Sequence, residues 1–402
     1  MNIAFFYDKG TLPVIGGVAS ISYNLGMLFR KRGHHVFFIG IKDLHHLEYD
    51  ENQTFLINNN LLDETNIQYI EDYIRRNEIQ IIINQTGSYN LSYISFLDKV
   101  RNRIKSIANR ELYIITCFHT SIYTNVLNIA YEKEHELKKK HIGIVFHLLK
   151  LKVVYHTLLC FFIKKHRRQY REVINLSNLT IVLCPGQEYE LKRMAGMKRC
   201  EKIKIINNTL SDFGKIIDES KKENVVLWVG AFSYSIKRPD FMLKIWSSVQ
   251  NKFPSWKLIL LGDGSNFEDA KSLSKELNLK NVEFKGRVES STYFEKAKFL
   301  CMTSTHEAFP MVLMEAMNNK TVPFAFNSFT SAPFIIENGQ NGVLVTPFNI
   351  AEYAKKLSSA MESSVEYNNM SENAYKSMER FSPVKVVTEW EKCFGELTKT
   401  DI

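Results

Sequence analysis

Short runs of apolar residues alternate along the chain with longer segments that have helical spacing. In the first half the runs, rich in β-branched residues, occupy positions 2–8, 35–41, 79–85, 112–118 and 179–185. In the second half they occupy positions 224–230, 256–262, 281–286, 297–304, 321–326 and 342–347. Segments such as Ala19–Lys31 and Phe241–Lys252 carry apolar residues at helical spacing. Short strands alternating with amphipathic helices predict βαβ units and parallel sheets.

This pattern occurs twice, and each time it opens with a strand that leads to a glycine turn, at Gly16-Gly17 and at Gly230. The stretch 211–222 is polar, lacks a strand pattern and is predicted to be a linker. The chain is therefore predicted to have an α/β fold of two doubly wound, Rossmann-like domains facing a cleft, at 1–210 and 223–382. Ligands of such sheets bind beyond the carboxyl ends of the strands, so those loops are where chemistry is expected.

The composition is that of an ordinary globular protein, with 45% hydrophobic and 24% charged positions among 402 residues. Disordered, collagen-like and coiled-coil classes are excluded on that basis. The six cysteines include no C-x-x-C pair, and Cys117, Cys184 and Cys301 lie within apolar runs. Buried reduced thiols, together with a first segment lacking a basic region and a cleavage site, predict an intracellular protein.

The net charge of +9 is concentrated in one segment. Between Leu137 and Arg168 there are no acidic residues, and the whole surplus is local. The charge therefore indicates an electropositive patch rather than a basic surface. Its members are Lys138, Lys139, Lys140, Lys150, Lys152, Lys164, Lys165, Arg167 and Arg168.

The part of this segment between His141 and Ile163 is largely apolar and, as one helix, would be about 33 Å long, near bilayer thickness. Lys150 and Lys152 near its middle would each cost about 2.5–3.5 kcal/mol in a bilayer core, which argues against a membrane span. We expect instead a helical region that lies on an anionic membrane. The alternative is a soluble helical pair that covers the N-terminal sheet. No nucleic-acid-binding module is recognised, and no nucleic acid is expected as a partner.

The most specific loop lies at 304–317, after an apolar strand. Pro310 stands where a helix should begin, and the amides of Met311 and Val312 would form an anion site. Glu307 and Glu315 would repel a phosphate there unless they accept hydrogen bonds from neutral hydroxyls. A nucleotide sugar supplies a diphosphate between two sets of hydroxyls, so this loop points to such a ligand. A capped surface helix is the alternative interpretation.

Glu307 and Glu315 are separated by seven residues, and the segment resembles the E-x7-E segment of glycosyltransferase family 4. Gly16-Gly17-Val18, Phe118-His119 and 204–208 match the family's pattern in its order, as do Gly230 followed by Lys237, 260–264 and 338–345. The resemblance covers about the whole chain. It implies a retaining enzyme of the GT-B fold, whose C-terminal helix, here 383–402, crosses back to the N-terminal domain.

The resemblance also implies roles for single residues. Glu307 would bind hydroxyls of the transferred sugar and Glu315 those of the ribose. Lys237 and the amides after Pro310 would neutralise the diphosphate, His119 would orient the donor sugar, and backbone near Val288 would meet the base. Glu307, His119 and Lys237 form the implied catalytic set. The implied donor-binding set is Gly16, Gly17, Arg238, Phe309, Pro310, Met311, Val312, Glu315, Gly262 and Val288.

Sequence and resemblance together predict a hexosyltransferase that uses a nucleotide-diphosphate sugar, with UDP favoured over GDP. The acceptor would be a saccharide or a lipid-linked saccharide, in polysaccharide or glycolipid synthesis on the inner face of the cell membrane. No D-x-D motif occurs, so no metal and no cofactor is expected. A nucleotide-sugar epimerase of the same fold and an inactive nucleotide-sugar-binding partner remain alternatives, the latter because Ala231 stands where the family usually has Arg.

Overall fold

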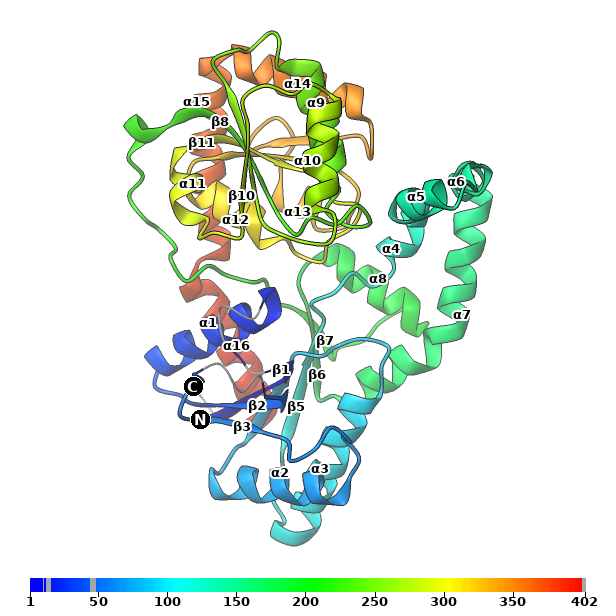
Figure 1. Cartoon of the computed structure of the whole chain (residues 1–402). Helices are drawn as coiled ribbons and strands as arrows, with labels where there is room; N and C mark the ends of the chain where they lie inside the picture. Colours follow the sequence, from blue (N-terminus) through cyan, green and yellow to red (C-terminus); the bar gives the residue numbers. More distant parts are fainter. Residues whose placement is uncertain (10, 12–15, 44–47, 400–402) are drawn as a thin grey trace. The chain divides into compact units, whose positions relative to one another are not determined.

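The computed structural model describes residues 1–9, 11, 16–43 and 48–399, and it confirms the predicted α/β class (Figure 1). The chain forms two compact units, each of which is described by itself. The first comprises the described parts of 1–122, 163–211 and 381–402, and the second comprises 123–162 and 212–380. Residues 400–402 of the predicted last helix lie outside the described residues.

The first unit contains a parallel sheet in the order β3-β2-β1-β4-β5-β6-β7. The strands are β1 (Asn2–Lys9), β2 (His35–Lys42), β3 (Gln53–Phe55), β4 (Ile81–Asn84), β5 (Tyr113–Cys117), β6 (Leu179–Val182) and β7 (Ile203–Ile205). The helices wholly within this unit are α1 (Gly17–Lys31), α2 (Glu64–Arg76), α3 (Ser92–Ala108), α8 (Pro185–Ala195) and α16 (Pro383–Thr398). The three-residue strand β3 was not predicted, because so short a run carries no alternation.

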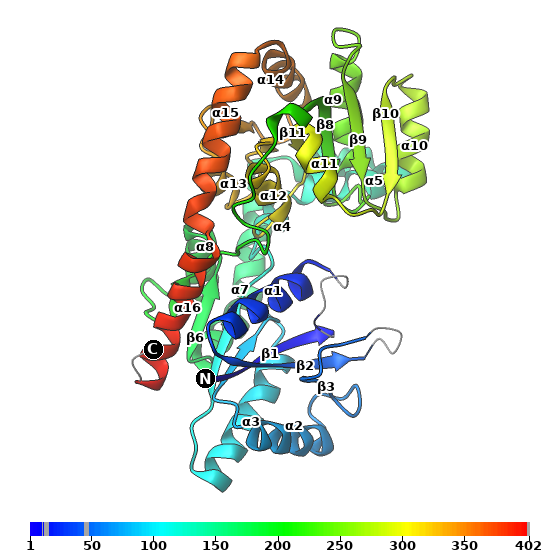
Figure 2. The ribbon, with the colours of Figure 1, turned by 90° about the vertical axis from the view of Figure 1, so that its left-hand side faces the viewer.

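The C-terminal helix α16 packs in the first unit, as the resemblance implied (Figure 2). Its rings of Trp390 and Phe394 lie 6.0 and 5.4 Å from the ring of Phe29 on α1. Glu391 accepts from the guanidinium of Arg32, with an Nη2–Oε2 distance of 2.9 Å. Burying two aromatic side chains contributes on the order of 3–6 kcal/mol, which fixes this helix far from its sequence neighbours.

The second unit contains a parallel sheet in the order β10-β9-β8-β11-β12-β13. The strands are β8 (Glu223–Val229), β9 (Lys257–Leu261), β10 (Val282–Gly286), β11 (Ala297–Met302), β12 (Val322–Phe326) and β13 (Val343–Val345). The helices of 212–380 are α9 (Pro239–Val249), α10 (Phe267–Glu276), α11 (Ser291–Lys296), α12 (Met311–Asn318), α13 (Ala332–Ile335), α14 (Ile350–Glu362) and α15 (Ser364–Ser377). Trp228, Trp246 and Tyr353 are among its largest buried side chains.

Both sheets share one topology. Numbered within each unit, the first six strands lie in the order 3-2-1-4-5-6, which is the doubly wound Rossmann order. The order reverses between β1 and β4 in the first unit and between β8 and β11 in the second. The loops that leave these strands are where such sheets bind ligands.

Residues 123–162 group with the second unit, whereas the sequence had placed them in the N-terminal domain. They form α4 (Thr124–Leu127), α5 (Ile129–Lys139), α6 (Gly143–Leu149) and the beginning of α7 (Lys152–Leu176). The physical reason is a set of polar and ring contacts to 212–380. The ring of Tyr131 lies 3.8 Å from that of Phe348, and Glu134 is paired with Arg238.

Among the described residues, no single helix has the length and apolar character needed to span a membrane. Taken together, α6 and α7 are long and apolar enough for a span, but the two helices meet at a bend of 76°. The single helix considered for 141–163 is thus two helices that meet at Lys150-Leu151.

Candidate functional site

The predicted pair Lys237 and Glu307 meets at the switch point of the second sheet. Lys237 lies on the loop after β8, and Glu307 lies on the loop after β11. Their Nζ and Oε1 atoms are 2.5 Å apart, and their side chains are 25% and 14% exposed. The pair is therefore largely desolvated yet still reachable, which strengthens its attraction for a charged or hydroxylated ligand.

Hydrogen bonds join the two loops that carry this pair. Thr305 donates its amide to the carbonyl of Ile236 at 2.7 Å and its hydroxyl to the carbonyl of Ser235 at 2.9 Å. Thr303 lies 2.9 Å from the carbonyl of Lys237 and accepts from the indole of Trp228 at 3.0 Å. The positions of Lys237 and Glu307 are therefore coupled through backbone, and not through their own side chains alone.

Helix α12 begins at Met311, four residues after Glu307 and directly after Pro310, where the sequence predicted a helix to begin. Pro310 is its N-cap, and the first turn carries no acidic side chain. The first amides of a helix have no partner within it, and the helix dipole adds a partial positive charge there. Met311 and Val312 in this turn are partly exposed, while Phe309 is buried. This helix end is suited to an anion, as is the neighbouring lysine.

Gly262 is required by the close approach of two loops. It has a φ of +125°, and a Cβ placed on it would lie 1.9 Å from the carbonyl oxygen of Gly230. Gly264 likewise approaches the backbone of Phe232. The loops after β8 and β9 can therefore lie against each other only with glycine at these positions.

The side chain of Glu315 is partly exposed on α12. Burial raises its pKa to about 7, and the charges of Asp212 and Glu289 add to the shift. Glu289 directly follows Val288, the position predicted to meet the base, so Glu315 and this segment influence each other electrostatically. Val288 itself is 43% exposed.

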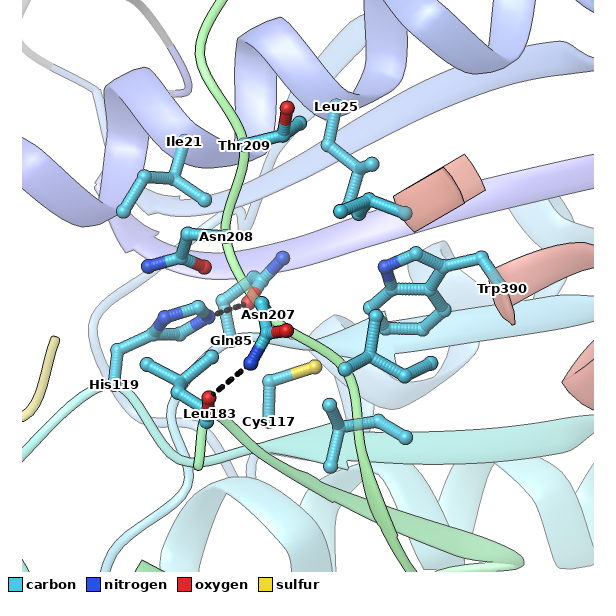
Figure 3. Close-up of a pocket in the computed structure, with 13 residues that line it drawn as sticks. Ile21, Leu25, Gln85, Cys117, His119, Leu183, Asn207, Asn208, Thr209 and Trp390 are labelled. Carbon is cyan, nitrogen blue, oxygen red and sulfur yellow. Dashed lines mark hydrogen bonds between the residues drawn. The ribbon is translucent and has the colours of Figure 1, made fainter. Parts of the chain in front are cut away.

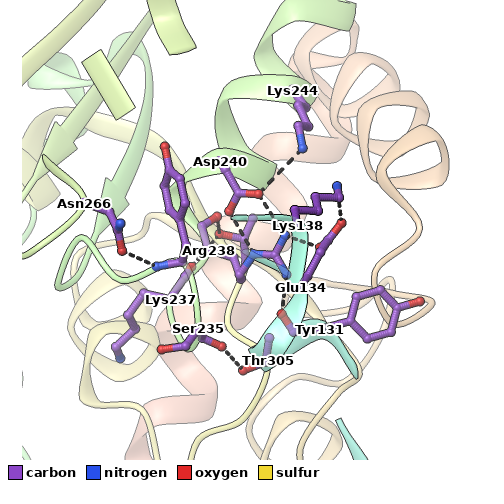
Figure 4. A network of polar contacts seen from close by, with 12 residues as sticks. Tyr131, Glu134, Lys138, Ser235, Lys237, Arg238, Asp240, Lys244, Asn266 and Thr305 are labelled. Atoms are coloured by element: carbon purple, nitrogen blue, oxygen red, sulfur yellow. Dashed lines mark hydrogen bonds and ion pairs between the residues drawn. The ribbon is translucent and has the colours of Figure 1, made fainter. Parts of the chain in front are cut away.

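Arg238 was predicted to bind the donor, and the structure corrects this interpretation (Figure 4). Its guanidinium is bound to both carboxylate oxygens of Asp240 at 2.8 Å, to Glu134 at 2.6 Å and to the carbonyl of Tyr131 at 2.8 Å. It also stacks on the ring of Phe241, with 3.5 Å to the centroid. Only 2% of Arg238 is exposed, so it does not replace the cation missing at Ala231.

Residues of α4 and α5 that contact the site loops were missed in the sequence. Asn128 donates to the carbonyls of Thr305 and Ser328 at 2.5 and 2.8 Å. His306, next to Glu307, has its Nδ1 atom 2.8 Å from Glu132. These contacts join residues more than 100 positions apart in the chain, so no local sequence pattern predicts them.

In the first unit, Gly16 and Gly17 lie at the start of α1, where Gly16 has a φ of +143°. A Cβ on either glycine would meet no described atom within 4 Å. Helix α1 has no acidic residue in its first turn. It can serve as a second anion-binding helix end.

His119 follows β5 and lines a small cavity with Gln85, Asn207 and Asn208 (Figure 3). Its Nε2 atom is paired with the amide oxygen of Gln85, and its Nδ1 atom has no partner among the described residues. Burial lowers the pKa of His119 to about 4, so the ring is neutral at physiological pH. Because Nε2 must donate to an oxygen, Nδ1 is left as an acceptor. The cavity leaves about 20 Å³ for the centre of a water-sized molecule, enough for one water.

The predicted membrane-contact segment exposes apolar side chains beside its basic ones. Ile144 is 72% exposed, Val153 77% and Phe161 67%. Lys150 lies over the rings of Tyr131 and Phe146, 5.1 and 4.7 Å from their centroids. The two ends of this segment differ in charge. At its beginning, Lys138 and Lys140 are paired with acidic residues on α5.

With this geometry in view, the C-terminal half can be compared with known families. Residues 212–377 match the model of the glycosyl transferases group 1. The matched stretch contains Lys237, Glu307, Glu315 and the whole of the second sheet. The group 1 match therefore covers the Lys237–Glu307 pair and α12, and it agrees with the broader family that the resemblance implied.

Two curated relatives extend the comparison. The chain is 31% identical over 185 residues to an uncharacterized glycosyltransferase of Haemophilus influenzae, covering 46% of this chain and 52% of that protein. It is 29% identical over 179 residues to a Campylobacter jejuni enzyme, covering 44% of this chain and 49% of that protein. That enzyme is an α-1,4-N-acetyl-D-galactosaminyltransferase whose name includes a PP-undecaprenol saccharide. The chain spans about half the length of these relatives.

The solved structure of Anabaena HepE in complex with UDP is similar over both units. It gives a TM-score of 0.70 at 17% identity and covers 98% of this chain and 100% of that one. At this identity the likeness concerns the fold. It supports the predicted GT-B type of fold, with two α/β domains in one chain.

Proposed function

We propose that this protein is a retaining glycosyltransferase that moves a hexose-type sugar from a nucleotide-diphosphate sugar to a saccharide or lipid-linked saccharide. The observation that carries the proposal is the Lys237–Glu307 pair at the switch point of the second sheet, with Glu307 four residues before the first residue of α12. A cation, a helix end and a carboxylate together suit a diphosphate joined to a sugar. The group 1 match over the same residues supports the reaction class.

UDP is the proposed nucleotide, with Glu315 accepting from the ribose hydroxyls. The likeness to HepE, which has also been solved with UDP-glucose, agrees with this choice. A lipid-linked acceptor agrees with the printed name of the Campylobacter relative. His119 is proposed to orient the donor sugar; its ring is neutral, and its Nδ1 atom is left as a hydrogen-bond acceptor.

In the proposed reaction the bond between the anomeric carbon and the diphosphate oxygen breaks, and a bond to the acceptor oxygen forms on the same face. The acceptor proton passes to an oxygen of the leaving diphosphate, so UDP departs with it. Lys237 and the amides of α12 would stabilise the charge that develops on the leaving group. Glu307 would hold hydroxyls of the transferred sugar and fix its orientation. No metal is required in this scheme, because these groups neutralise the diphosphate.

The test is nucleotide release from a panel of UDP- and GDP-sugars without added metal, for wild type and Glu307→Ala. We expect release from one UDP-sugar, reduced on the order of 10²-fold or more in the variant. Glu268→Ala is the matched control, since Glu268 lies exposed on α10 and pairs only locally with Lys271. Product analysis separates transfer from epimerisation. Donor binding without release, even with membrane lipid extract present, would favour an inactive partner, and no binding would overturn the proposal.

We further propose that the segment around α6 and α7 docks on an anionic membrane surface, such as the inner face of the cell membrane. Exposed Ile144, Val153 and Phe161 beside Lys164 and Lys165 combine apolar and basic contacts, and each lysine contributes on the order of 1 kcal/mol there. Cosedimentation with vesicles containing phosphatidylglycerol should exceed that with neutral vesicles. The double variant Lys164→Glu/Lys165→Glu should lose the difference, whereas Lys271→Glu on α10 should keep it.

A further inference from the structure

Both members of the Lys237–Glu307 pair have a direct chain neighbour held by helix α5. Arg238, which follows Lys237, is bound by Glu134, and His306, which precedes Glu307, lies 2.8 Å from Glu132. The sequence of the E-x7-E segment and of the loop after β8 does not predict a contact with residues 123–162. One helix therefore reaches both loops of the site.

The contact at Arg238 is the more deeply buried of the two. Arg238 adopts the left-handed conformation, with a φ of +53°, at the cap of α9. Its side chain and those of Glu134 and Asp240 are 3%, 12% and 8% exposed. Burial alone would raise the pKa of Glu134, but the charge of Arg238 and hydrogen bonds from Lys138 and Arg238 lower it below its usual value. Glu134 thus stays ionised and keeps Arg238 in place (Figure 4).

The contact at the second loop has two parts. Asn128, at the junction of α4 and α5, binds the carbonyls of Thr305 and Ser328, which fixes the loop backbone on the side of Glu307. Oε1 of Glu132 lies 2.8 Å from Nδ1 of His306, a contact that becomes an ion pair when that ring is protonated, and this oxygen has no hydrogen-bond partner among the described residues. Since Thr305 also binds the loop of Lys237, α5 and the two site loops form one connected network.

We propose that Glu134 and Glu132 are positioning residues that set the geometry of Lys237 and Glu307 toward the diphosphate and the transferred sugar. This inference rests on the proposed function and adds the element that holds its site. Neither glutamate touches the reacting atoms; each acts through the backbone of the residue beside the pair. Small misplacements of such groups are costly, since a shift of about 1 Å can lower a rate on the order of 10²-fold.

The experiment compares Glu134→Gln and Glu132→Gln with Glu136→Gln in the full chain. Glu136 is the matched control, because it lies on α5 but pairs with Lys133 and Lys140 of its own helical region. We expect kcat for donor hydrolysis to fall at least about tenfold in Glu134→Gln, less in Glu132→Gln, and to be unchanged in Glu136→Gln. Thermal unfolding of each variant shows how much of the protein remains folded.

A double-mutant cycle separates positioning from a merely structural role. If Glu134 acts through Lys237, then Lys237→Ala should lower kcat much less in the Glu134→Gln background than in the wild type. If Glu134→Gln lowers only the melting temperature, and Lys237→Ala keeps its full effect in both backgrounds, the positioning role is overturned.

Failure of the proposed function is distinguishable from failure of this inference. Should wild type bind UDP but hydrolyse no donor, UDP affinity replaces kcat as the readout. Weaker binding in Glu134→Gln but not in Glu136→Gln would then support the positioning role, and equal binding in both would overturn it. Absence of UDP binding in wild type would overturn the function and the inference together.

Discussion

The two sheets have the same strand order, but the side chains on the loops that follow their central strands differ. In the second unit, the loops after β8 and β11 bring together a lysine and a glutamate at 2.5 Å. In the first unit, the loops after β4 and β5 bring together Gln85 and a neutral His119. The topology thus determines where ligand-binding loops meet, and the residues on those loops determine which ligand they suit.

The difference separates two kinds of recognition. Charged groups and the end of α12 suit a diphosphate, whose charge must be balanced where water is partly excluded. Neutral amides and an imidazole acceptor suit hydroxyls, which can be bound without a fixed charge.

Replacing the lysine of the Lys237–Glu307 pair should have the largest effect on donor hydrolysis. Lys237→Ala removes the cation and leaves Glu307 partly buried without its partner. We expect kcat/KM for donor hydrolysis to fall on the order of 10²–10³-fold, because charge on the leaving diphosphate is no longer balanced. Lys244→Ala is the control, since Lys244 lies on α9 and reaches only the edge of the Arg238 network. Equal losses in the two variants would contradict the special role of Lys237.

The glycines of the two units should also respond differently. Gly262→Ala places a methyl group 1.9 Å from the carbonyl of Gly230 at a φ of +125°, so the loop must shift. We expect a loss of stability of at least about 3 kcal/mol and a loss of UDP binding. A methyl group on Gly17, in the first turn of α1, meets no described atom within 4 Å, so Gly17→Ala should leave the free energy of unfolding unchanged or raise it by about 1 kcal/mol at most. Urea unfolding and calorimetric UDP titration measure both, and a neutral Gly262→Ala would disprove the close approach.

Most of this contrast could be predicted from the sequence, because it depends on local patterns. Apolar runs located the strands, and Pro310 located the beginning of α12. Glu307 lies in the loop before α12 and Glu315 lies within that helix, as the sequence predicted. Such features depend on hydrophobic periodicity and on helix capping, both of which can be read within about ten residues.

What the sequence could not show are contacts between distant segments. Lys237-Arg238 looked like two available cations, but only packing reveals that Arg238 is 2% exposed and bound by Glu134. The partner of residues 123–162 could not be predicted either, because the distribution of their charges favoured no single surface. Their position follows from a few long-range ion pairs and ring contacts, which leave no periodic pattern.

The neutral site should show itself in the pH dependence of stability. The pKa of His119 is about 4 in the folded protein and about 6.5 when unfolded, so the unfolded state binds the proton more readily. Stability is therefore lost as pH falls from 6.5 to 4, by up to about 3 kcal/mol from this group. His119→Gln should remove that part of the slope. Urea unfolding of both proteins across this range checks it, and parallel pH curves would show that His119 is not desolvated.

Glu315 should respond to pH with the opposite sign, and with a smaller effect on function. Its folded pKa of about 7 lies above the unfolded value of about 4.3, so this group lowers stability as pH rises from 4.3 to 7. If the ionised form accepts the ribose hydroxyls, UDP affinity should rise about tenfold between pH 6 and pH 8. The phosphate of UDP also titrates in this range and changes the affinity by itself. The Glu315→Gln variant keeps this contribution of UDP but lacks that of Glu315, so it is the reference. Calorimetric titration at the two pH values should therefore show a steeper rise in wild type than in Glu315→Gln. Equal rises would mean that Glu315 does not contact the nucleotide. The site of the second unit would then bind its ligand through the Lys237–Glu307 pair and α12, without this carboxylate.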